Sequence, residues 1–200
     1  MKIILASQSA RRRDILENLG ISFDIKVSRV DESMNDSLSA GENVEAVSLR
    51  KAMAVESELK VATDDDVLII ASDTVVVCDG IILGKPRDKA HATEMMRMLS
   101  GRRHSVISGI AVIYRGKRIS SHEETEVEFR ELTDAEIEAY ASTDEPYDKA
   151  GGYGIQDKAA IFVRAIHGDY LNVVGLPVFR LFRLIESEFG IGYFGLVTSK

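Results

Sequence analysis

The chain has 200 residues, of which 45% are hydrophobic and 28% charged, and its formal net charge is −7. A chain of this length can bury one hydrophobic core. The excess of acidic residues disfavours binding to nucleic-acid backbones and anionic membranes, although a local basic pocket could still bind a small anion. The single cysteine, Cys78, excludes an intrachain disulfide and fits a reducing compartment. Residues 1–6 are too short for a signal peptide and the apolar run 67–71 is too short to cross a membrane, so we expect a cytoplasmic protein.

The expected elements alternate between strands and helices. In chain order we expect a strand at 3–6, a helix at 11–19, a strand at 23–27, a helix at 42–59, strands at 67–71 and 75–78, a helix at 88–99, strands at 105–114 and 119–129, a helix after Thr133, strands at 160–166 and 170–174, and a helix at 176–189. Asp79-Gly80 and Arg115-Gly116-Lys117 are hairpin signals, and Thr133 with Glu136 predicts a capping box. This order indicates one α/β or α+β sheet domain over residues 1–200, with two lobes allowed.

Three consecutive arginines, residues 11–13, follow Ser9, a good N-cap residue. Cations in the first turn of a helix are unfavourable by about 0.3–1 kcal/mol each. A bound anion such as phosphate would make these unfavourable interactions favourable. It would lie among the helix N–H groups, the hydroxyls of Ser7 and Ser9 and the guanidinium groups of Arg11 and Arg12. Three solvated arginines, partly compensated by nearby acids, are an equally supported alternative.

Two further segments carry polar side chains beside apolar runs. Ser72-Asp73-Thr74 stands where one strand meets another, and a carboxylate there can hold Mg²⁺ or orient a water molecule. Taken alone, an Asx-type turn is the simpler reading of that segment. Gly84-Lys85-Pro86 follows a hairpin, and its rigid backbone would aim the Lys85 ammonium group at a phosphate, although such turns are also common on surfaces.

The segment Asp148 to Gln156 contains Gly151, Gly152 and Gly154. Glycines at these positions allow the backbone to approach a ligand closely. The Gln156 amide can donate and accept, which matches the N3–H and O4 edge of uracil or thymine, or it can satisfy backbone groups of its own loop. The spacing is not that of a P-loop.

Taken jointly, these segments resemble the Maf family of nucleotide pyrophosphatases. The eight matching segments, named at the end of this paragraph, follow the family's order over nearly the whole chain. Chance does not explain eight such matches in the same order. One departure is Ala10, where the family pattern usually has a proline that would preset the helix start, so we expect a slightly looser loop. The tail 190–200 runs past the usual final helix, and we attach no function to it. The matching residues are Ser7-Gln8-Ser9-Ala10-Arg11-Arg12, Val30-Asp31-Glu32, Arg50-Lys51-Ala52, Ser72-Asp73-Thr74, Gly84-Lys85-Pro86, Ser100-Gly101 with His104, Asp148 to Gln156, and Gly175-Leu176-Pro177.

The resemblance implies a Maf/ITPase-like fold, a mixed twisted sheet with flanking helices forming two lobes around a cleft. It also implies the reaction NTP + H₂O → NMP + pyrophosphate, with attack at the α-phosphorus. By analogy Asp73 accepts the proton of the attacking water, and Glu32 binds the metal or positions the water. Mg²⁺, or Mn²⁺ in its place, would be held by Asp73 and Glu32, while Arg11, Lys51 and Lys85 would meet the phosphates.

Within the family, Thr74 and the Gly-Ile-Gln of the loop resemble the branch that hydrolyses dTTP and UTP. Arg11, Thr74 and Gln156 are therefore the expected specificity residues, and modified pyrimidine triphosphates are expected substrates of such a house-cleaning enzyme. The alternatives are another base preference, such as methylated GTP, or a nucleotide-binding regulator of septum formation. A homodimer is an expectation from the family alone.

Simpler structural readings apply to several of these positions. Lys51 lies in an expected helix and could merely pair with an acid, and Glu32 could be a solvated loop residue. We interpret His104 as structural, because no second histidine lies at ligand spacing. Met95, Met96 and Met98 form a group at helical spacing, which is typical of core residues.

Overall fold

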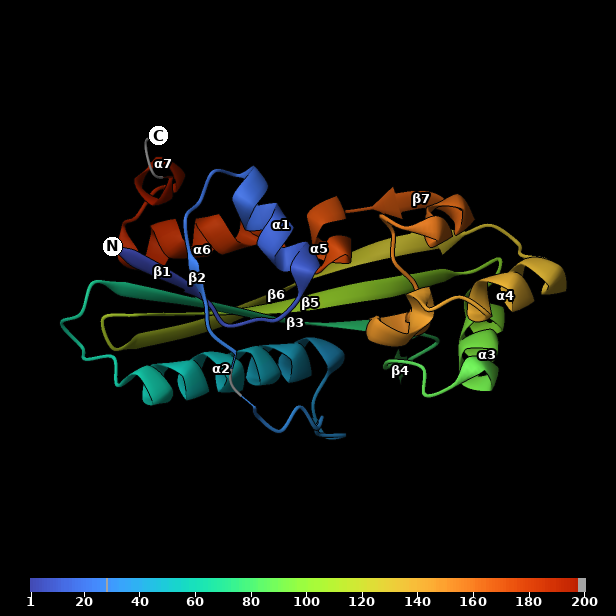
Figure 1. The fold of residues 1–200 in the computed structure, drawn as a ribbon, viewed down its shortest axis with the longest axis horizontal. Helices are drawn as coiled ribbons and strands as arrows, with labels where there is room; N and C mark the ends of the chain where they lie inside the picture. Colours follow the sequence, from blue (N-terminus) through green and yellow to red (C-terminus); the bar gives the residue numbers. More distant parts are fainter. Residues whose placement is uncertain (28, 198–200) are drawn as a thin grey trace. The chain divides into compact units, whose positions relative to one another are not determined.

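The computed structural model describes residues 1–27 and 29–197, so the last three residues of the predicted tail lie outside the described chain. Figure 1 shows the elements in chain order. They are β1 (Lys2–Leu5), α1 (Ala10–Asn18), β2 (Asp24–Ile25), α2 (Ala40–Leu59), β3 (Val67–Cys78), β4 (Ile81–Leu83), α3 (Lys89–Leu99), β5 (Arg103–Tyr114), β6 (Lys117–Phe129), α4 (Asp134–Ala141), the 3₁₀ turns η1 (Glu145–Asp148), η2 (Ala150–Gly152) and η3 (Lys158–Phe162), then β7 (Val163–His167), α5 (Tyr170–Val174), α6 (Val178–Phe189) and α7 (Tyr193–Leu196). None of the helices in the described ranges is long and apolar enough to cross a membrane.

The strands pair in the order β2-β1-β3-β5-β6-β7, with β4 joined to β3. β1 is parallel to both β2 and β3, whereas β3–β4 and β6–β7 are antiparallel pairs. The sheet is therefore mixed, which confirms the predicted α/β class. The two predicted hairpins are also confirmed, because Asp79-Gly80 and Arg115-Gly116 adopt the positive φ angles that tight hairpin turns need.

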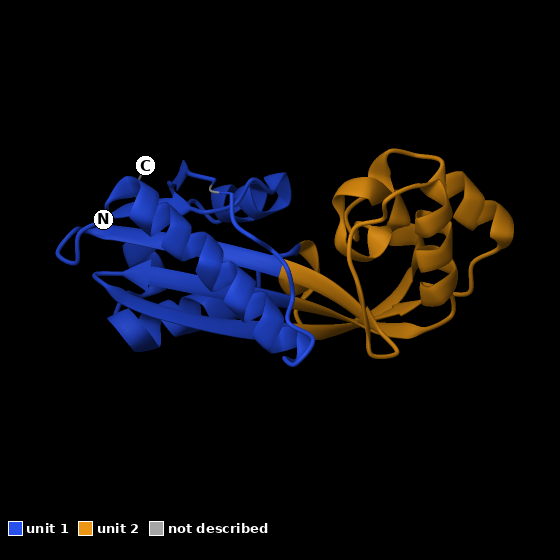
Figure 2. Cartoon of the chain, turned by 90° about the horizontal axis from the view of Figure 1, so that it is seen from below, with its two compact units in different colours: residues 1–73, 108–123, 175–200 blue, residues 74–107, 124–174 orange. Residues whose placement is uncertain are grey.

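The chain divides into two compact units, shown in different colours in Figure 2. Unit 1 comprises Met1–Asp73, Ser108–Glu123 and Gly175–Lys200, and unit 2 comprises Thr74–Ile107 and Glu124–Val174. Strands β3, β5 and β6 contribute residues to both units. Each unit has its own hydrophobic core, described below. The prediction of a single functional domain over the whole chain stays a prediction.

The core of unit 1 forms between the sheet and helix α2. Ala52 and Val55 of α2 pack against apolar residues of β1, β3 and β5, and Figure 1 shows α2 along one face of these strands. The helix begins with a complete capping box, in which Ser39 and Glu42 bond each other's backbone N–H groups. Its close approach to β5 requires Gly109, where an added Cβ would lie 2.3 Å from the Val44 carbonyl oxygen. The sheet therefore fixes the position of α2, which carries Lys51.

The core of unit 2 contains the methionines of helix α3 that the sequence predicted to be buried. Met95 and Met96 are buried there and Met98, which is partly buried, packs against this core, which confirms the predicted methionine core. Cys78 is buried in the same core. Helix α3 has Asp88 as its N-cap, and the predicted capping box of Thr133 and Glu136 starts α4. The capping box was predicted correctly because it depends on residues only three positions apart.

Two expected elements were wrong. The run 72–74 does not separate two strands, because β3 continues without a break from Val67 to Cys78. Residues 170–174 form helix α5 instead of a strand. At its start Asp169 accepts a hydrogen bond from the Leu171 backbone, and the buried Asn172 amide donates to the Val106 carbonyl and the Thr125 hydroxyl. The long-range bonds of Asn172 outweigh the β propensity of the apolar residues.

Two expected strands are shorter than predicted. Only Asp24–Ile25 of the run 23–27 pairs in the sheet, as β2. The run 160–166 begins inside the 3₁₀ turn η3, so β7 starts at Val163.

Candidate active site

Unit 1 brings three of the predicted catalytic side chains together around one ammonium group. Lys51 Nζ of α2 lies 2.8 Å from Asp73 Oδ1 and 3.0 Å from Glu32 Oε1. The side chains of Lys51 and Asp73 are each 14% exposed, and that of Glu32 is 58% exposed. Lys51 pairs with acids, as the simpler structural interpretation expects. These two ion pairs bring carboxylates from two distant segments to the same ammonium group.

Asp73 projects from the middle of β3, and not from a strand end or an Asx turn as the sequence suggested. Its neighbour Ser72 is buried and donates a hydrogen bond of 3.0 Å to the Gly175 carbonyl. The two polar residues are tolerated within an apolar strand because each has a partner from another segment. The carboxylate is therefore held on rigid backbone, as a catalytic group requires.

Glu32 lies in the loop between β2 and α2, and hydrogen bonds order the residues on either side of it. Asp31 accepts from the backbone N–H of Ser33 at 2.8 Å and from its hydroxyl at 2.7 Å, which lowers the pKa of Asp31. Arg50, one residue before Lys51, donates to the Ser33 carbonyl at 2.8 Å. The helix that carries Lys51 thus also holds the loop that carries Glu32. Sequence reasoning assigned no role to Arg50.

The arginines at the start of α1 differ from one another in their environments. Arg12 is buried, and it donates from Nε to the Gly175 carbonyl at 2.7 Å and from Nη1 to the Ser7 hydroxyl at 3.2 Å. Burial lowers the pKa of Arg12, while the carboxylates of Asp73 and Glu32 oppose that shift, so both acids lie within its electrostatic reach. Arg12 therefore links α1 to the segment that begins at Gly175. Its role in binding substrate stays a prediction.

The other members of the cluster are closer to solvent. Arg11 is partly buried, whereas Arg13 is exposed and pairs with Asp14 and Glu17, as the solvated alternative expects. Ser9 is the N-cap by position, but its side chain makes no capping hydrogen bond. The described first turn of α1 contains no acid, so the helix end keeps its positive character.

Unit 2 brings the Lys85 turn against the glycine loop. The Gly151 N–H donates to the Gly84 carbonyl at 3.0 Å, and an added Cβ at Gly152 would lie 3.2 Å from Pro86 Cγ. An added Cβ at Gly151, whose φ is +67°, would lie 2.7 Å from Val76 Cγ2. These glycines thus allow a close approach to other parts of the protein, and the approach to a ligand stays a prediction.

Lys85 and Gln156 are exposed and Thr74 is partly buried. All three belong to unit 2, whereas Asp73 is the last residue of the first segment of unit 1. The convergence of these residues with Arg11 and Asp73 around one polyphosphate stays a prediction.

The glycine loop is anchored inside unit 2 by a buried pair of rings. Tyr153 is buried, and its hydroxyl lies 2.7 Å from His104 Nε2, while Phe129 contacts both rings edge-on. Burial lowers the pKa of His104 to about 4 and raises that of Tyr153, so both groups are neutral near pH 7. The predicted structural role of His104 is confirmed, because its ring anchors the glycine loop through Tyr153.

This burial predicts an acid sensitivity of the fold. Below pH 6.5 the unfolded chain protonates His104 while the folded chain does not until about pH 4, so acid favours unfolding across that interval. We expect His104 to account for a loss of about 3 kcal/mol of unfolding free energy between pH 7 and pH 4. Urea unfolding of the wild type and of His104→Phe at several pH values measures it. Parallel pH curves for the two proteins would contradict the prediction.

The donor set fits a magnesium ion that is shared with a substrate. Asp73 and Glu32 supply carboxylate oxygens close to one another, and Mg²⁺ in phosphate-processing sites usually takes one or two carboxylates together with phosphate oxygens and water. Within the described residues no group of three or more His, Cys, Asp or Glu side chains could hold a metal.

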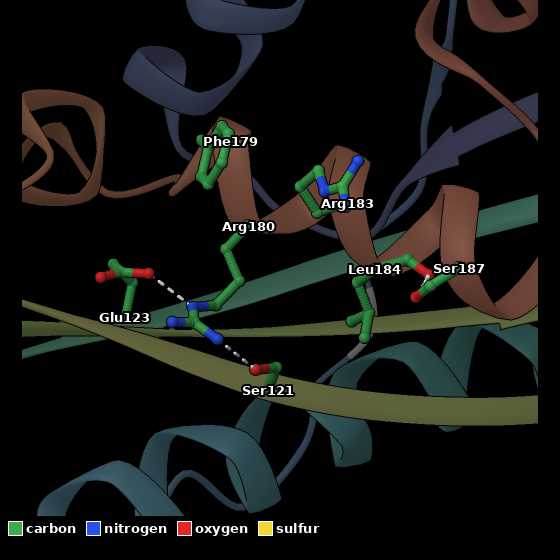
Figure 3. Close-up of a pocket in the computed structure, with 7 residues that line it drawn as sticks. All are labelled: Ser121, Glu123, Phe179, Arg180, Arg183, Leu184 and Ser187. Atoms are coloured by element: carbon green, nitrogen blue, oxygen red, sulfur yellow. Dashed lines mark hydrogen bonds and ion pairs between the residues drawn. The ribbon is translucent and has the colours of Figure 1, made fainter.

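A separate pocket of about 350 Å³ lies in unit 1 over α6 and β6 (Figure 3). Arg180 there donates to Glu123 and Ser121, and Arg183 pairs with Glu186. The pocket contains none of the predicted site residues. Its lining residues are Ser121, Glu123, Phe179, Arg180, Arg183, Leu184 and Ser187.

Comparisons with known proteins match almost the whole chain. A family model described as Maf-like protein matches residues 2–188. A protein of Moorella thermoacetica named dTTP/UTP pyrophosphatase is 47% identical over 198 residues, which are 98% of this chain and 99% of that protein. A Bacillus anthracis protein of the same name is 47% identical over 186 residues, 93% of this chain and 95% of that protein. Among solved structures, the Ham1 protein of Staphylococcus aureus aligns with a TM-score of 0.42 and 14% identity over 64% of this chain and 72% of that chain.

Proposed function

Because the chain belongs to the Maf family, we propose that it hydrolyses dTTP and UTP to the nucleoside monophosphate and pyrophosphate. Two relatives that share 47% of its residues over more than nine-tenths of its length carry that activity in their names. The observation that carries the proposal is the arrangement of Asp73 and Glu32 around Lys51 Nζ, at 2.8 and 3.0 Å. It provides a carboxylate base beside a cation in a partly enclosed site.

In the proposed reaction the Asp73 carboxylate accepts a proton from the water that attacks the α-phosphorus. Lys51 fixes the orientation of that carboxylate, since its ammonium group contacts Oδ1 directly. Arg11 and Lys85 stabilise charge on the transferring and leaving phosphate oxygens. Mg²⁺ or Mn²⁺, held by Asp73 and Glu32, would neutralise phosphate charge when bound.

The pyrimidine preference is assigned to Gln156, with Arg11 and Thr74 as the other specificity residues. Gln156 is exposed directly after the buried Ile155, so its amide is available to a ligand. An amide can accept from N3–H and donate to O4 of thymine or uracil in the same plane. Cytosine presents the opposite pattern at these two positions, which gives the site a physical basis for discrimination.

The setting of the enzyme follows from the same proposal. The acidic net charge of −7 and the buried single Cys78 fit a cytoplasmic enzyme of free nucleotides that has no nucleic-acid partner. A homodimer is the assembly we propose from family membership.

A substrate panel tests the proposed function. The panel contains dTTP, UTP, CTP, ATP, GTP and methylated GTP, with separate detection of pyrophosphate and orthophosphate, in Mg²⁺ and in EDTA. We expect kcat/KM for dTTP and UTP to exceed that for CTP by about tenfold or more, with pyrophosphate as the product. EDTA should abolish turnover. Orthophosphate as the first product would overturn the proposed bond cleavage, and negligible activity on every pyrimidine triphosphate would overturn the base preference.

A further inference from the structure

Lys149 is a buried lysine within the glycine loop, which is unusual for this residue type. Its side chain is only 9% exposed. The ammonium group donates to the Glu145 carbonyl at 2.8 Å and to Asp148 Oδ1 at 2.7 Å, and it lies 3.5 Å from Asp157 Oδ2. All of these partners lie in the segment that surrounds Gln156, within unit 2.

These contacts distinguish Lys149 from a phosphate-binding lysine. An ammonium group has three N–H donors, and three acceptors of the loop surround that of Lys149. Lys85, in the neighbouring turn, is exposed instead. Binding a phosphate through Lys149 would require breaking contacts in a nearly solvent-free position, which is costly.

The side chain of Lys149 also explains Gly154. An added Cβ at Gly154 would lie 2.7 Å from Lys149 Cε and 2.4 Å from Asp157 Oδ2. The aliphatic stem therefore crosses the backbone at Gly154 on its way to Asp157. The contacts fall two residues before and one residue after Gln156, so Lys149 holds the chain on both sides of that amide.

We infer that Lys149 is a positioning residue for base selectivity, and that it acts by fixing the backbone on both sides of Gln156. The inference rests on the proposed function, which gives Gln156 the contact with the base. A two-point amide contact discriminates between bases only if its orientation is fixed before binding, because a mobile side chain would rearrange to suit either base. The ionic contacts of Lys149 order the loop when the protein folds. The conformational entropy of the loop is therefore lost before binding and does not weaken the affinity for the nucleotide.

Lys149→Met tests the inference, because methionine keeps the length of the stem and removes the ammonium group. We expect kcat/KM for dTTP to fall about tenfold, mainly through KM, with little change for CTP. The matched control is Lys158→Met, which removes a charge from an exposed side chain of the same segment and should leave both values unchanged. Asp157→Asn, at a more exposed partner, should lower selectivity in the same direction and serves if Lys149→Met folds poorly.

A double variant and an exchange measurement decide between positioning and general damage. If Lys149 acts through Gln156, adding Lys149→Met to Gln156→Ala should not lower selectivity further. Amide hydrogen exchange should increase in residues 153–157 of Lys149→Met and not of Lys158→Met. Unchanged exchange in these residues, equal losses for all nucleotides, or multiplicative effects in the double variant would overturn the inference.

Failure of the proposed function gives a different result. A wild-type enzyme that preferred a purine triphosphate would overturn the pyrimidine preference. The inference would then still predict that Lys149→Met lowers the ratio of kcat/KM values for the preferred and the rejected nucleotide. If that ratio were the same in Lys149→Met as in the wild type, the inference alone would be overturned.

Discussion

Replacing Asp73 with asparagine is expected to lower kcat by about 100- to 10,000-fold, the usual contribution of a general base. Asparagine has the same shape and can still accept a hydrogen bond from Lys51, so the local structure should persist. Lys51 also keeps its contact with Glu32 at 3.0 Å. Nucleotide binding should therefore remain, which isothermal titration calorimetry with dTTP can measure beside steady-state turnover.

The control for this substitution is Asp36→Asn, which removes a carboxylate from an exposed part of the loop that contains Glu32. It should leave kcat within about twofold of the wild type, because surface substitutions of this kind have small effects. Equal turnover in wild type and Asp73→Asn would remove Asp73 from its role. A variant that loses binding together with turnover would indicate that the carboxylate mainly organises the site.

Replacing Gly109 with alanine is expected to lower the free energy of unfolding by about 2–4 kcal/mol. The added methyl group would lie 2.3 Å from the Val44 carbonyl oxygen and 2.4 Å from its carbon, and backbone atoms in a helix cannot rotate away. Helix α2 must then move outward from β5, and Lys51 moves with it. Urea unfolding followed by circular dichroism measures the loss, and turnover should fall as well.

Gly192→Ala is the matched control, because an added Cβ there would have its nearest neighbour, Glu186 Oε1, at 4.0 Å. Its φ of −74° is also accessible to alanine, so stability should change by less than about 1 kcal/mol. If Gly109→Ala were as stable as this control, the contact between α2 and β5 would have to be looser than the structure indicates.

Local signals in the sequence predicted much of the fold. The capping box of Thr133 and Glu136 and the hairpin at Arg115-Gly116 are confirmed because each depends on a few neighbouring residues. The sequence did not predict that β3 continues through Ser72 and Asp73. Those polar residues look like a break until their partners Gly175 and Lys51 are known, and those partners lie far away along the chain.

The candidate site was predicted unevenly for the same reason. Residue types and family resemblance pointed to Glu32, Lys51 and Asp73, and the structure places Lys51 in contact with both acids. Nothing local indicated that Arg12 would be bonded to the Gly175 carbonyl, because that bond joins residues 163 positions apart. Lys149 was also missed, since its burial depends on how Glu145 and Asp157 fold around it.

The division of each unit into separate segments has a consequence for how the protein is made on the ribosome. Unit 2 is complete once residue 174 has been synthesised, whereas unit 1, which contains the N-terminus, still lacks everything from Gly175 onward. The usual order, in which the N-terminal part of a nascent chain finishes folding first, is therefore reversed. Lys51 can meet Asp73 early in translation, but Arg12 must wait for the emerging Gly175 before its guanidinium group is fixed.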